Sequence, residues 1–100
     1  MSINLVIFSH SDYSYLWNII QDSIENIKEL NPIFISNKTN LDKPTGFIKY
    51  IEYDETYCYA KRWINLLKYI ESKYIIVVND VNIILNYDVY KIKNLIQKNR

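Results

Sequence analysis

Length, composition and charge limit what this protein can be. The chain has 100 residues, of which 49% are hydrophobic and 23% charged, as is typical of one globular domain with its own core. The net charge of +1 provides no broad positive field, so we expect neither nucleic acid nor a membrane surface as a partner. Cys58 is the sole cysteine, which excludes an internal disulfide and favours a reducing, cytoplasmic location. No apolar run approaches the length of a membrane span.

The first part of the chain predicts a strand, a helix and a second strand. Residues 3–8 are mostly apolar and predict a strand, and Ser11 or Asp12 is expected to cap the helix that follows. Apolar residues then recur at steps of three or four, which indicates a helix with one buried face: Leu16, Ile20, Ile24, Ile27 and Leu30. Pro32 ends this helix, and residues 33–35 predict a short second strand.

The remaining part predicts two more strands and two more helices. Residues 47–53 predict a third strand, and Lys49 and Glu52 favour an exposed edge position for it. A second helical stripe follows at Tyr59, Trp63, Leu66, Leu67 and Ile70. Four consecutive aliphatic residues within 74–78 predict a fourth strand that is buried on both faces. A third helix is expected to begin at 86–88, with one apolar face made of Val89, Ile92, Leu95 and Ile96.

This order of elements predicts an α/β fold with a mostly parallel sheet and right-handed crossovers. We expect the Rossmann-like strand order 3-2-1-4, helices on both faces, and a single domain over residues 1–100. In open sheets of this kind, ligands bind beyond the carboxyl ends of the strands, at the point where the strand order reverses. That switch point lies between the first and fourth strands.

Two polar clusters are expected to meet at this switch point. Residues 9–12 (Ser-His-Ser-Asp) follow the first strand, and residues 79–82 (Asn-Asp-Val-Asn) follow the fourth. Asp80 and Asn82 carry oxygen ligands of the kind that Mn²⁺ or Mg²⁺ prefers, and such a cation could hold a diphosphate. The alternative is that both are ordinary turn residues.

These stretches resemble the nucleotide-binding half of a GT-A-type, family-2-like glycosyltransferase. Residues 5–17 are similar to the family's opening strand and the following loop with Ser, Asp and Trp. Residues 59–82 resemble its helix, its apolar strand and the acidic metal motif that ends the strand. The resemblance implies metal-assisted binding of a UDP- or GDP-linked sugar and, if the chain is active, hexosyl transfer from that donor.

The resemblance also implies roles for individual residues. The loop after the first strand would line the base and ribose, Asn37 would stand where the family often has a base-contacting acid, and Arg62 would lie near the diphosphate. Asp80 and Asn82 would hold the metal. The residues expected to bind the nucleotide sugar are Ser9, His10, Ser11, Asp12, Asn37, Arg62 and Asp80. Each also has a plainer interpretation, as a helix cap, a loop residue or part of a solvated helix face.

Two departures from the family pattern lead to an alternative function. The family motif has two or three acids, whereas Asp80 stands alone between Asn79 and Asn82, so metal affinity should be lower. The family's second half, which holds the acceptor, is not expected in a chain of this length. The alternative is a non-enzymatic interaction module on the same scaffold, with self-association through the fourth strand. A receiver-like phosphoacceptor domain fits less well, because Asp12 has no paired acid beside it.

Five further residues are expected to have structural roles. Asp54 and Glu55 follow the third strand, and we expect them to cap the next helix. Cys58 is expected to be a small buried hydrophobe. Trp17 and Trp63 are expected in the core or at its boundary rather than against a ligand.

Overall fold

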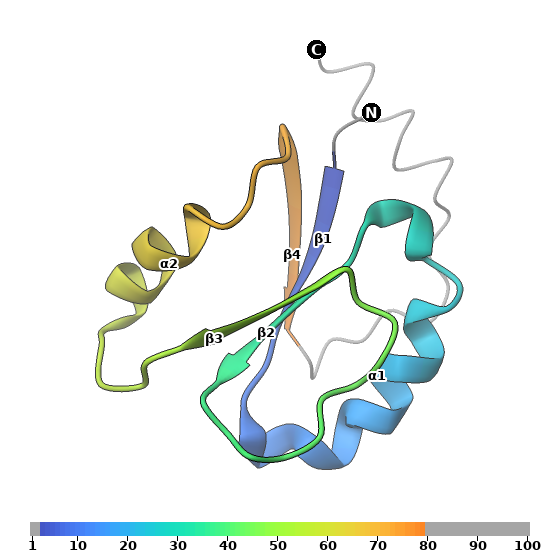
Figure 1. Cartoon of the computed structure of the whole chain (residues 1–100), viewed down its shortest axis with the longest axis horizontal. Helices are drawn as coiled ribbons and strands as arrows, with labels where there is room; N and C mark the ends of the chain where they lie inside the picture. Colours follow the sequence, from blue (N-terminus) through green and yellow to red (C-terminus); the bar gives the residue numbers. More distant parts are fainter. Residues whose placement is uncertain (1–2, 80–100) are drawn as a thin grey trace.

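The fold is built around a four-stranded sheet in which all neighbouring strands are parallel. The computed structural model describes residues 3–79 (Figure 1). The strands are β1 (Ile3–Phe8), β2 (Ile33–Asn37), β3 (Lys49–Tyr53) and β4 (Tyr74–Asn79), and the helices are α1 (Trp17–Ile24) and α2 (Tyr59–Leu67), with short 3-10 segments η1 (Ser11–Leu16) and η2 (Lys28–Leu30). The order β3-β2-β1-β4 confirms the predicted topology. The helix expected from 86–88 lies outside the described residues.

The two helices cover opposite faces of the sheet, as predicted (Figure 1). Successive side chains of a strand point to opposite faces, so β1 contributes to both cores. Its residues Ile3, Leu5 and Ile7 belong to the cluster on the α1 side, whereas Val6 and Phe8 belong to the cluster on the α2 side. This double burial explains why β1 is apolar at nearly every position.

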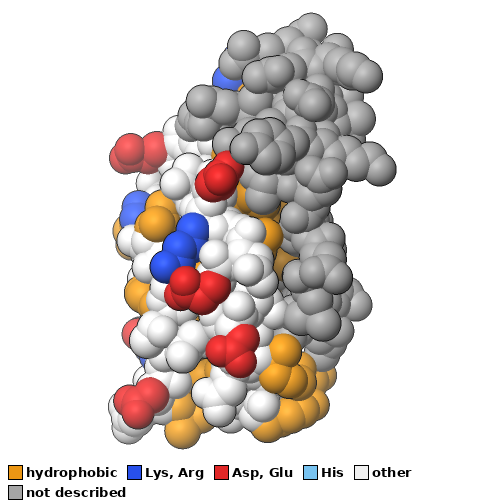
Figure 2. Space-filling view, turned by 90° about the vertical axis from the view of Figure 1, so that its right-hand side faces the viewer, with side chains coloured by type: hydrophobic (Ala, Val, Ile, Leu, Met, Phe, Trp, Pro, Cys, Tyr) orange, Lys and Arg blue, Asp and Glu red, His pale blue; other side chains and the backbone are white. Residues whose placement is uncertain are grey.

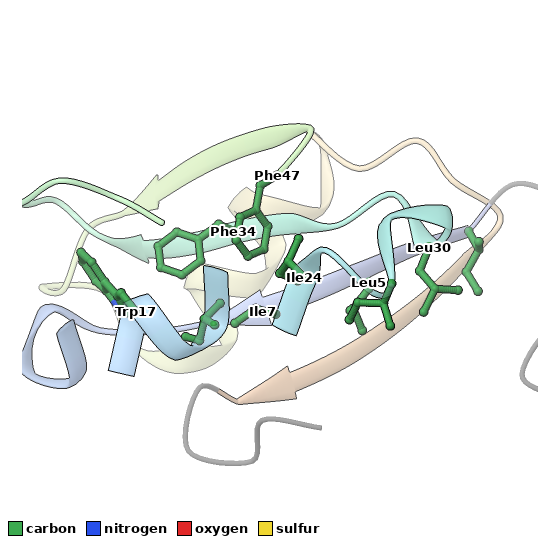
Figure 3. Packing of buried hydrophobic residues seen from close by; sticks show 10 residues of the cluster. Leu5, Ile7, Trp17, Ile24, Leu30, Phe34 and Phe47 are labelled. Carbon is green, nitrogen blue, oxygen red and sulfur yellow. The ribbon is translucent and has the colours of Figure 1, made fainter. Parts of the chain in front are cut away.

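The core on the α1 side combines aliphatic residues with three aromatic rings. Figure 3 shows Trp17, Phe34 and Phe47 toward one end of this cluster and Leu5 and Leu30 toward the other. The ring of Phe34 meets that of Trp17 edge-on at 5.4 Å and that of Phe47 at 5.2 Å between centroids. The predicted core position of Trp17 is therefore confirmed, since only 4% of its surface is exposed.

The first helical region is less regular than its apolar stripe suggested. The α-helix proper spans only Trp17–Ile24, and the 3-10 segments η1 and η2 precede and follow it. Asn31 ends the region in the left-handed conformation, with φ 50°. Its side chain donates to the Ile3 carbonyl at 3.1 Å, and its own carbonyl accepts from Asn4 at 2.8 Å. These bonds fasten the end of the region to the start of β1.

Gly46 allows the loop before β3 to pass close to α1. Its φ of +98° lies in the left-handed region, which favours glycine. A Cβ at this position would also lie 3.3 Å from Cγ2 of Ile24. The Thr45 amide next to it donates to the Gln21 side-chain oxygen at 2.9 Å, so the loop is bound directly to the helix.

The prediction that β4 is buried on both faces is wrong. Tyr74, Ile76 and Val78 are partly buried against the α1-side cluster, but Ile75 and Val77 are 36% and 46% exposed. The reason is the position of α2, whose buried side chains pack with residues of β1, β2 and β3. The α2 face of β4 therefore stays accessible.

The prediction of an exposed edge for β3 is confirmed. The strand ends the sheet at the side away from β4. Lys49, Tyr50 and Glu52 are exposed, and Ile51 and Tyr53 pack beneath α2. Charges at an edge discourage pairing with another strand.

On the face in Figure 2, acidic side chains are spread singly and basic ones lie among them, so this face carries no extended field of one charge. None of the helices that the structure describes is long and apolar enough to cross a membrane.

Candidate functional site

The structure brings the carboxyl ends of β1 and β4 together, as the predicted switch point requires. Phe8, the last residue of β1, is paired with Asn79, the last residue of β4. The polar loop of residues 9–12 leaves β1 at this edge, so the predicted juxtaposition is confirmed as far as Asn79. Asp80 and Asn82, the predicted metal ligands, lie outside the described residues.

Ser9 holds the loop in place and has little surface for a ligand. Its side chain is buried, and its Oγ accepts a hydrogen bond from the indole Nε1 of Trp17 at 2.9 Å. Its amide donates to the Ile35 carbonyl at 2.7 Å, and its carbonyl accepts from the Tyr53 hydroxyl at 2.9 Å. Ser9 therefore links β1 to α1, β2 and β3, which is a positioning role rather than the predicted contact with a nucleotide.

Asn37 and Ser11 form the next link between the strands. The Asn37 side-chain oxygen accepts the Ser11 amide at 2.7 Å, and its Nδ2 donates to the Ser11 hydroxyl at 3.0 Å. Asn37 is only 5% exposed. It is not the plain loop residue of the simpler interpretation, because its two bonds fix the loop that leaves β1 to the end of β2.

His10 caps η1, so the expectation that one of residues 9–12 caps the helix is confirmed, whereas the more specific choice of Ser11 or Asp12 is wrong. The backbone of His10 is extended, and its Nδ1 accepts the Asp12 amide at 3.0 Å. Its Nε2 lies 2.7 Å from Oε1 of Glu55. The two ring nitrogens therefore have different partners, the Asp12 amide at Nδ1 and the Glu55 carboxylate at Nε2. A histidine can replace the usual capping oxygen here because its second nitrogen is held by Glu55.

Two contacts cross the carboxyl end of β2. His10 and Ser9 follow β1, whereas Glu55 and Tyr53 belong to the end of β3 and the loop after it. Since β2 lies between β1 and β3, the contacts His10–Glu55 and Tyr53–Ser9 span it. The side chain of Asn37, at the end of β2, is itself buried and offers little surface to a ligand.

The accessible polar groups of the loop are few. The Asp12 side chain is 83% exposed, and its carboxylate lies 3.5 Å from Nδ1 of His10. The His10 side chain is 30% exposed and Ser11 is half-buried. Among the predicted loop residues, Asp12 is thus the one best placed to meet a ligand.

Arg62 organises the loop between β3 and α2. Its Nε donates to the Tyr57 carbonyl at 2.8 Å and its Nη2 to the Glu55 carbonyl at 2.7 Å. Its guanidinium lies over the Tyr53 ring, 5.0 Å from the centroid. Two of its five N–H donors are therefore engaged in holding this loop, and its predicted place near a diphosphate stays a prediction.

The predicted capping by Asp54 and Glu55 is wrong. Asp54 accepts the amide of Thr56 at 2.9 Å and its hydroxyl at 2.7 Å, which makes a local turn. The position that caps α2 is held by Cys58, whose side chain makes no capping bond.

The prediction that Cys58 is buried is also wrong, since it is exposed. It precedes the first turn of α2 and so lies outside the stripe that meets the sheet.

The turn at Asp54 leads to a pH prediction. The Thr56 amide, then the Thr56 hydroxyl, lower the pKa of Asp54 below its ordinary value of 3.8, and Lys38 and Arg62 act in the same direction. A carboxyl group whose pKa is lower in the folded than in the unfolded chain stabilises the fold at any pH above its unfolded pKa. This stabilisation is lost as the pH falls through the lowered, folded-state pKa. We expect Thr56→Val to move the pKa of Asp54 upward, toward 3.8, when carboxyl chemical shifts are titrated by NMR. An unchanged pKa would show that the Thr56 hydroxyl does not stabilise the carboxylate.

Two hollows lie away from the switch point. One, of about 390 Å³, is lined by residues of β3 and α2 and includes Lys38, Asp54, Tyr57 and Arg62. The other, of about 380 Å³, lies where β1, β2 and β3 begin and includes Asn4, Asn31 and Lys49. Within residues 3–79, no group of three or more His, Cys, Asp or Glu side chains could hold a metal ion. The residues of the predicted metal site thus do not include such a group within the described part of the chain.

Comparisons of the chain with protein-family models, with curated proteins and with solved structures found no match.

Sequence reasoning missed the partners that hold the site together. Glu55 was interpreted as a helix cap, but it binds His10, and Tyr53 binds the Ser9 carbonyl. The residues of each pair are more than 40 positions apart in the sequence, so no local pattern joins them. One partner could have been anticipated from the sequence. Trp17 was expected in the core, and the N–H of a buried indole needs a hydrogen-bond acceptor nearby, which here is the Ser9 hydroxyl.

Proposed function

We propose that this chain binds a nucleotide diphospho-sugar, in the manner of the donor-binding half of a GT-A-type glycosyltransferase. The observation that carries the proposal is the pairing of Phe8 with Asn79 at the switch point of a parallel sheet, with the loop of residues 9–12 beside it. Ligands of open α/β sheets bind at such points. The free, exposed Cys58 agrees with a reducing, cytoplasmic setting for this function.

Within the predicted site, we separate the residues that would contact the ligand from those that hold the loop in position. Asp12 is exposed and could accept hydrogen bonds from ribose hydroxyls, with His10 beside it. Ser9 and Asn37 hold the loop in position through their hydrogen bonds to Trp17 and Ser11. Asp80 follows Asn79 directly in the sequence, and we assign it to a Mn²⁺ or Mg²⁺ ion that neutralises the diphosphate.

Titration calorimetry with UDP and GDP tests this proposal. We expect both to bind more tightly when Mn²⁺ or Mg²⁺ is present, because the metal bridges Asp80 and the diphosphate. Asp80→Ala should lower metal-dependent affinity at least tenfold, which corresponds to about 1.4 kcal/mol. Asn82→Asp should raise it, since hard cations prefer charged oxygen ligands. The exposed Asp22 on α1 provides a matched control, and Asp22→Ala should leave binding unchanged.

Two outcomes would contradict parts of this proposal. Failure of both nucleotides to bind at millimolar concentration with metal would overturn nucleotide binding. Binding that is metal-independent and equal in Asp80→Ala would remove the metal and that residue from the site.

A second candidate function, interaction with another protein chain, is favoured by the surface of β4. This strand ends the described sheet, and within residues 3–79 no strand pairs with its outer edge. Its six residues carry no charge, and Ile75 and Val77 are exposed on one face. An uncharged edge of this kind is a template for another strand. In an antiparallel pair of two copies centred on Ile76, each Ile75 would lie opposite a Val77, a favourable aliphatic pair.

Light scattering over a range of concentrations tests this second function. We expect weak self-association, because two six-residue edges bury less area than a stable dimer interface needs. Val77→Lys should shift the chain toward monomer, since it places charge at the centre of the edge. Leu41→Lys, at an exposed position in the loop before β3, is the matched control. A monomer at all concentrations, or association unaffected by Val77→Lys, would rule out pairing through β4.

A further inference from the structure

Four aromatic rings gather on the α2 side of the carboxyl end of β1. The ring of Phe8 stacks on that of Tyr53, with 4.9 Å between centroids and 15° between planes. It also contacts Trp63 at 5.3 Å and Tyr59 at 5.8 Å. Phe8 is the residue paired with Asn79 and precedes the loop of residues 9–12. This aromatic cluster therefore borders the switch point.

Tyr59 is the accessible member of the cluster. It is 59% exposed, whereas Phe8 and Tyr53 are buried. Trp63 meets it edge-on at 6.3 Å, one turn further along α2, and Phe8 contacts it from the sheet. Tyr50 is 44% exposed and also contacts two rings, Phe34 and Phe47, but it lies on β3, at the end of the sheet away from β4. For Tyr15, which is 71% exposed, the described ring contact is with Tyr13 at 6.3 Å. The ring of Tyr59 is thus both accessible and held by two other rings.

A supported and exposed aromatic ring beside the switch point suits a flat partner. A nucleobase has an apolar π-face, and proteins that bind single bases commonly stack them on aromatic side chains. Little side-chain entropy would be lost on binding, because Phe8 and Trp63 already restrict Tyr59. The sugar of the donor is a poorer fit for this surface, since its hydroxyls need polar partners and the cluster is made of rings.

We propose that Tyr59 stacks on the base of the bound nucleotide. This inference rests on the proposed function, and it adds that the base contributes to affinity through its face. It predicts tolerance of different bases, because every base has a π-face. It also identifies a contact that the polar residues of the predicted site do not supply.

Titrations with ligands that contain or lack a base test the inference. UDP and GDP are compared with pyrophosphate, each in the presence of Mn²⁺, by calorimetry and by tryptophan fluorescence in a Trp17→Phe background, where the signal comes from Trp63, which contacts Tyr59. We expect Tyr59→Ala to weaken both nucleotides about tenfold, in line with the loss of one stacked base. Pyrophosphate binding should be unchanged, and Tyr59→Phe should retain nearly full nucleotide affinity because it keeps the ring.

Tyr69→Ala is the matched control. Tyr69 is 48% exposed and lies just beyond the opposite end of α2, where its carbonyl accepts Lys49 from the start of β3. Its replacement should not affect nucleotide binding. Circular dichroism establishes that each variant is folded, and Tyr59→Leu, which keeps apolar bulk without a π-face, replaces the alanine variant if that one unfolds.

The outcomes separate the inference from the proposed function. Nucleotide binding that is equal in the wild type, Tyr59→Ala and Tyr59→Leu overturns the stacking and leaves the proposed function standing. Loss of pyrophosphate and nucleotide binding together in Tyr59→Ala also overturns it, because the residue would then act through the structure of the site. Absence of nucleotide binding in the wild type overturns the proposed function and with it this inference.

Discussion

Replacing Phe34 by alanine is expected to lower the free energy of unfolding by about 3–5 kcal/mol. Phe34 is fully buried in β2 and contacts the rings of Trp17, Phe47 and Tyr50 at centroid distances of 5.4, 5.2 and 6.3 Å. Two contributions make up this loss. One is the burial free energy of the removed ring, and the other is the cost of the cavity that remains between the neighbouring rings. A loss of this size is a large part of the stability of a typical domain.

Urea denaturation followed by circular dichroism measures this effect. Ile64→Ala is the control, because Ile64 is 70% exposed on α2 and its truncation should change stability by no more than about 0.5 kcal/mol. A loss below about 1 kcal/mol for Phe34→Ala would contradict the central position of Phe34 in the α1-side core.

Replacing Asn37 by alanine is expected to lower the free energy of unfolding by about 1–3 kcal/mol, the cost of leaving a polar partner unsatisfied. The change removes the acceptor of the Ser11 amide at 2.7 Å and the donor to the Ser11 hydroxyl at 3.0 Å. It also removes the attachment of Ser11 to the end of β2, while the Ser9 amide stays bonded to the Ile35 carbonyl. We therefore expect faster hydrogen exchange at the Ser11 amide and weaker nucleotide binding.

Ser36→Ala is the control for Asn37→Ala. Ser36 is buried next to Asn37, and its hydroxyl donates to the Asn37 carbonyl at 3.1 Å, so its removal leaves no backbone amide without an acceptor. Exchange at the Ser11 amide should stay slow in this variant. Unchanged exchange in Asn37→Ala would mean that the loop is held by His10 and Ser9 alone.

The order and pairing of the strands could be predicted from the sequence. Apolar runs, helical stripes and the handedness of crossovers are local or general properties, and together they predict the order β3-β2-β1-β4. The same reasoning correctly placed the loop after β1 beside the end of β4. It also identified Lys49 and Glu52 as signs of an exposed edge.

The roles of individual polar residues could not be predicted in the same way. Ser9 and Asn37 were expected at a ligand, but their hydrogen bonds to Trp17 and Ser11 hold the loop in place. A short polar residue at a strand end has the same local sequence signal whether it faces a ligand or a neighbouring strand. Only the partner decides between these roles, and here that partner lies 8 positions away for Ser9 and 26 for Asn37.

The α/β class, the strand order and the edge of the sheet proposed for a ligand follow from periodicity and chain connectivity, so the amino-acid sequence was enough to predict them. Which side chains at that edge are accessible depends on the packing of distant elements and became known from the structure. The contact between His10 and Glu55 and the exposure of Val77 depend on how β3 and α2 pack over the sheet. Packing of this kind brings together residues that are distant in the sequence, and local sequence patterns contain no information about such contacts.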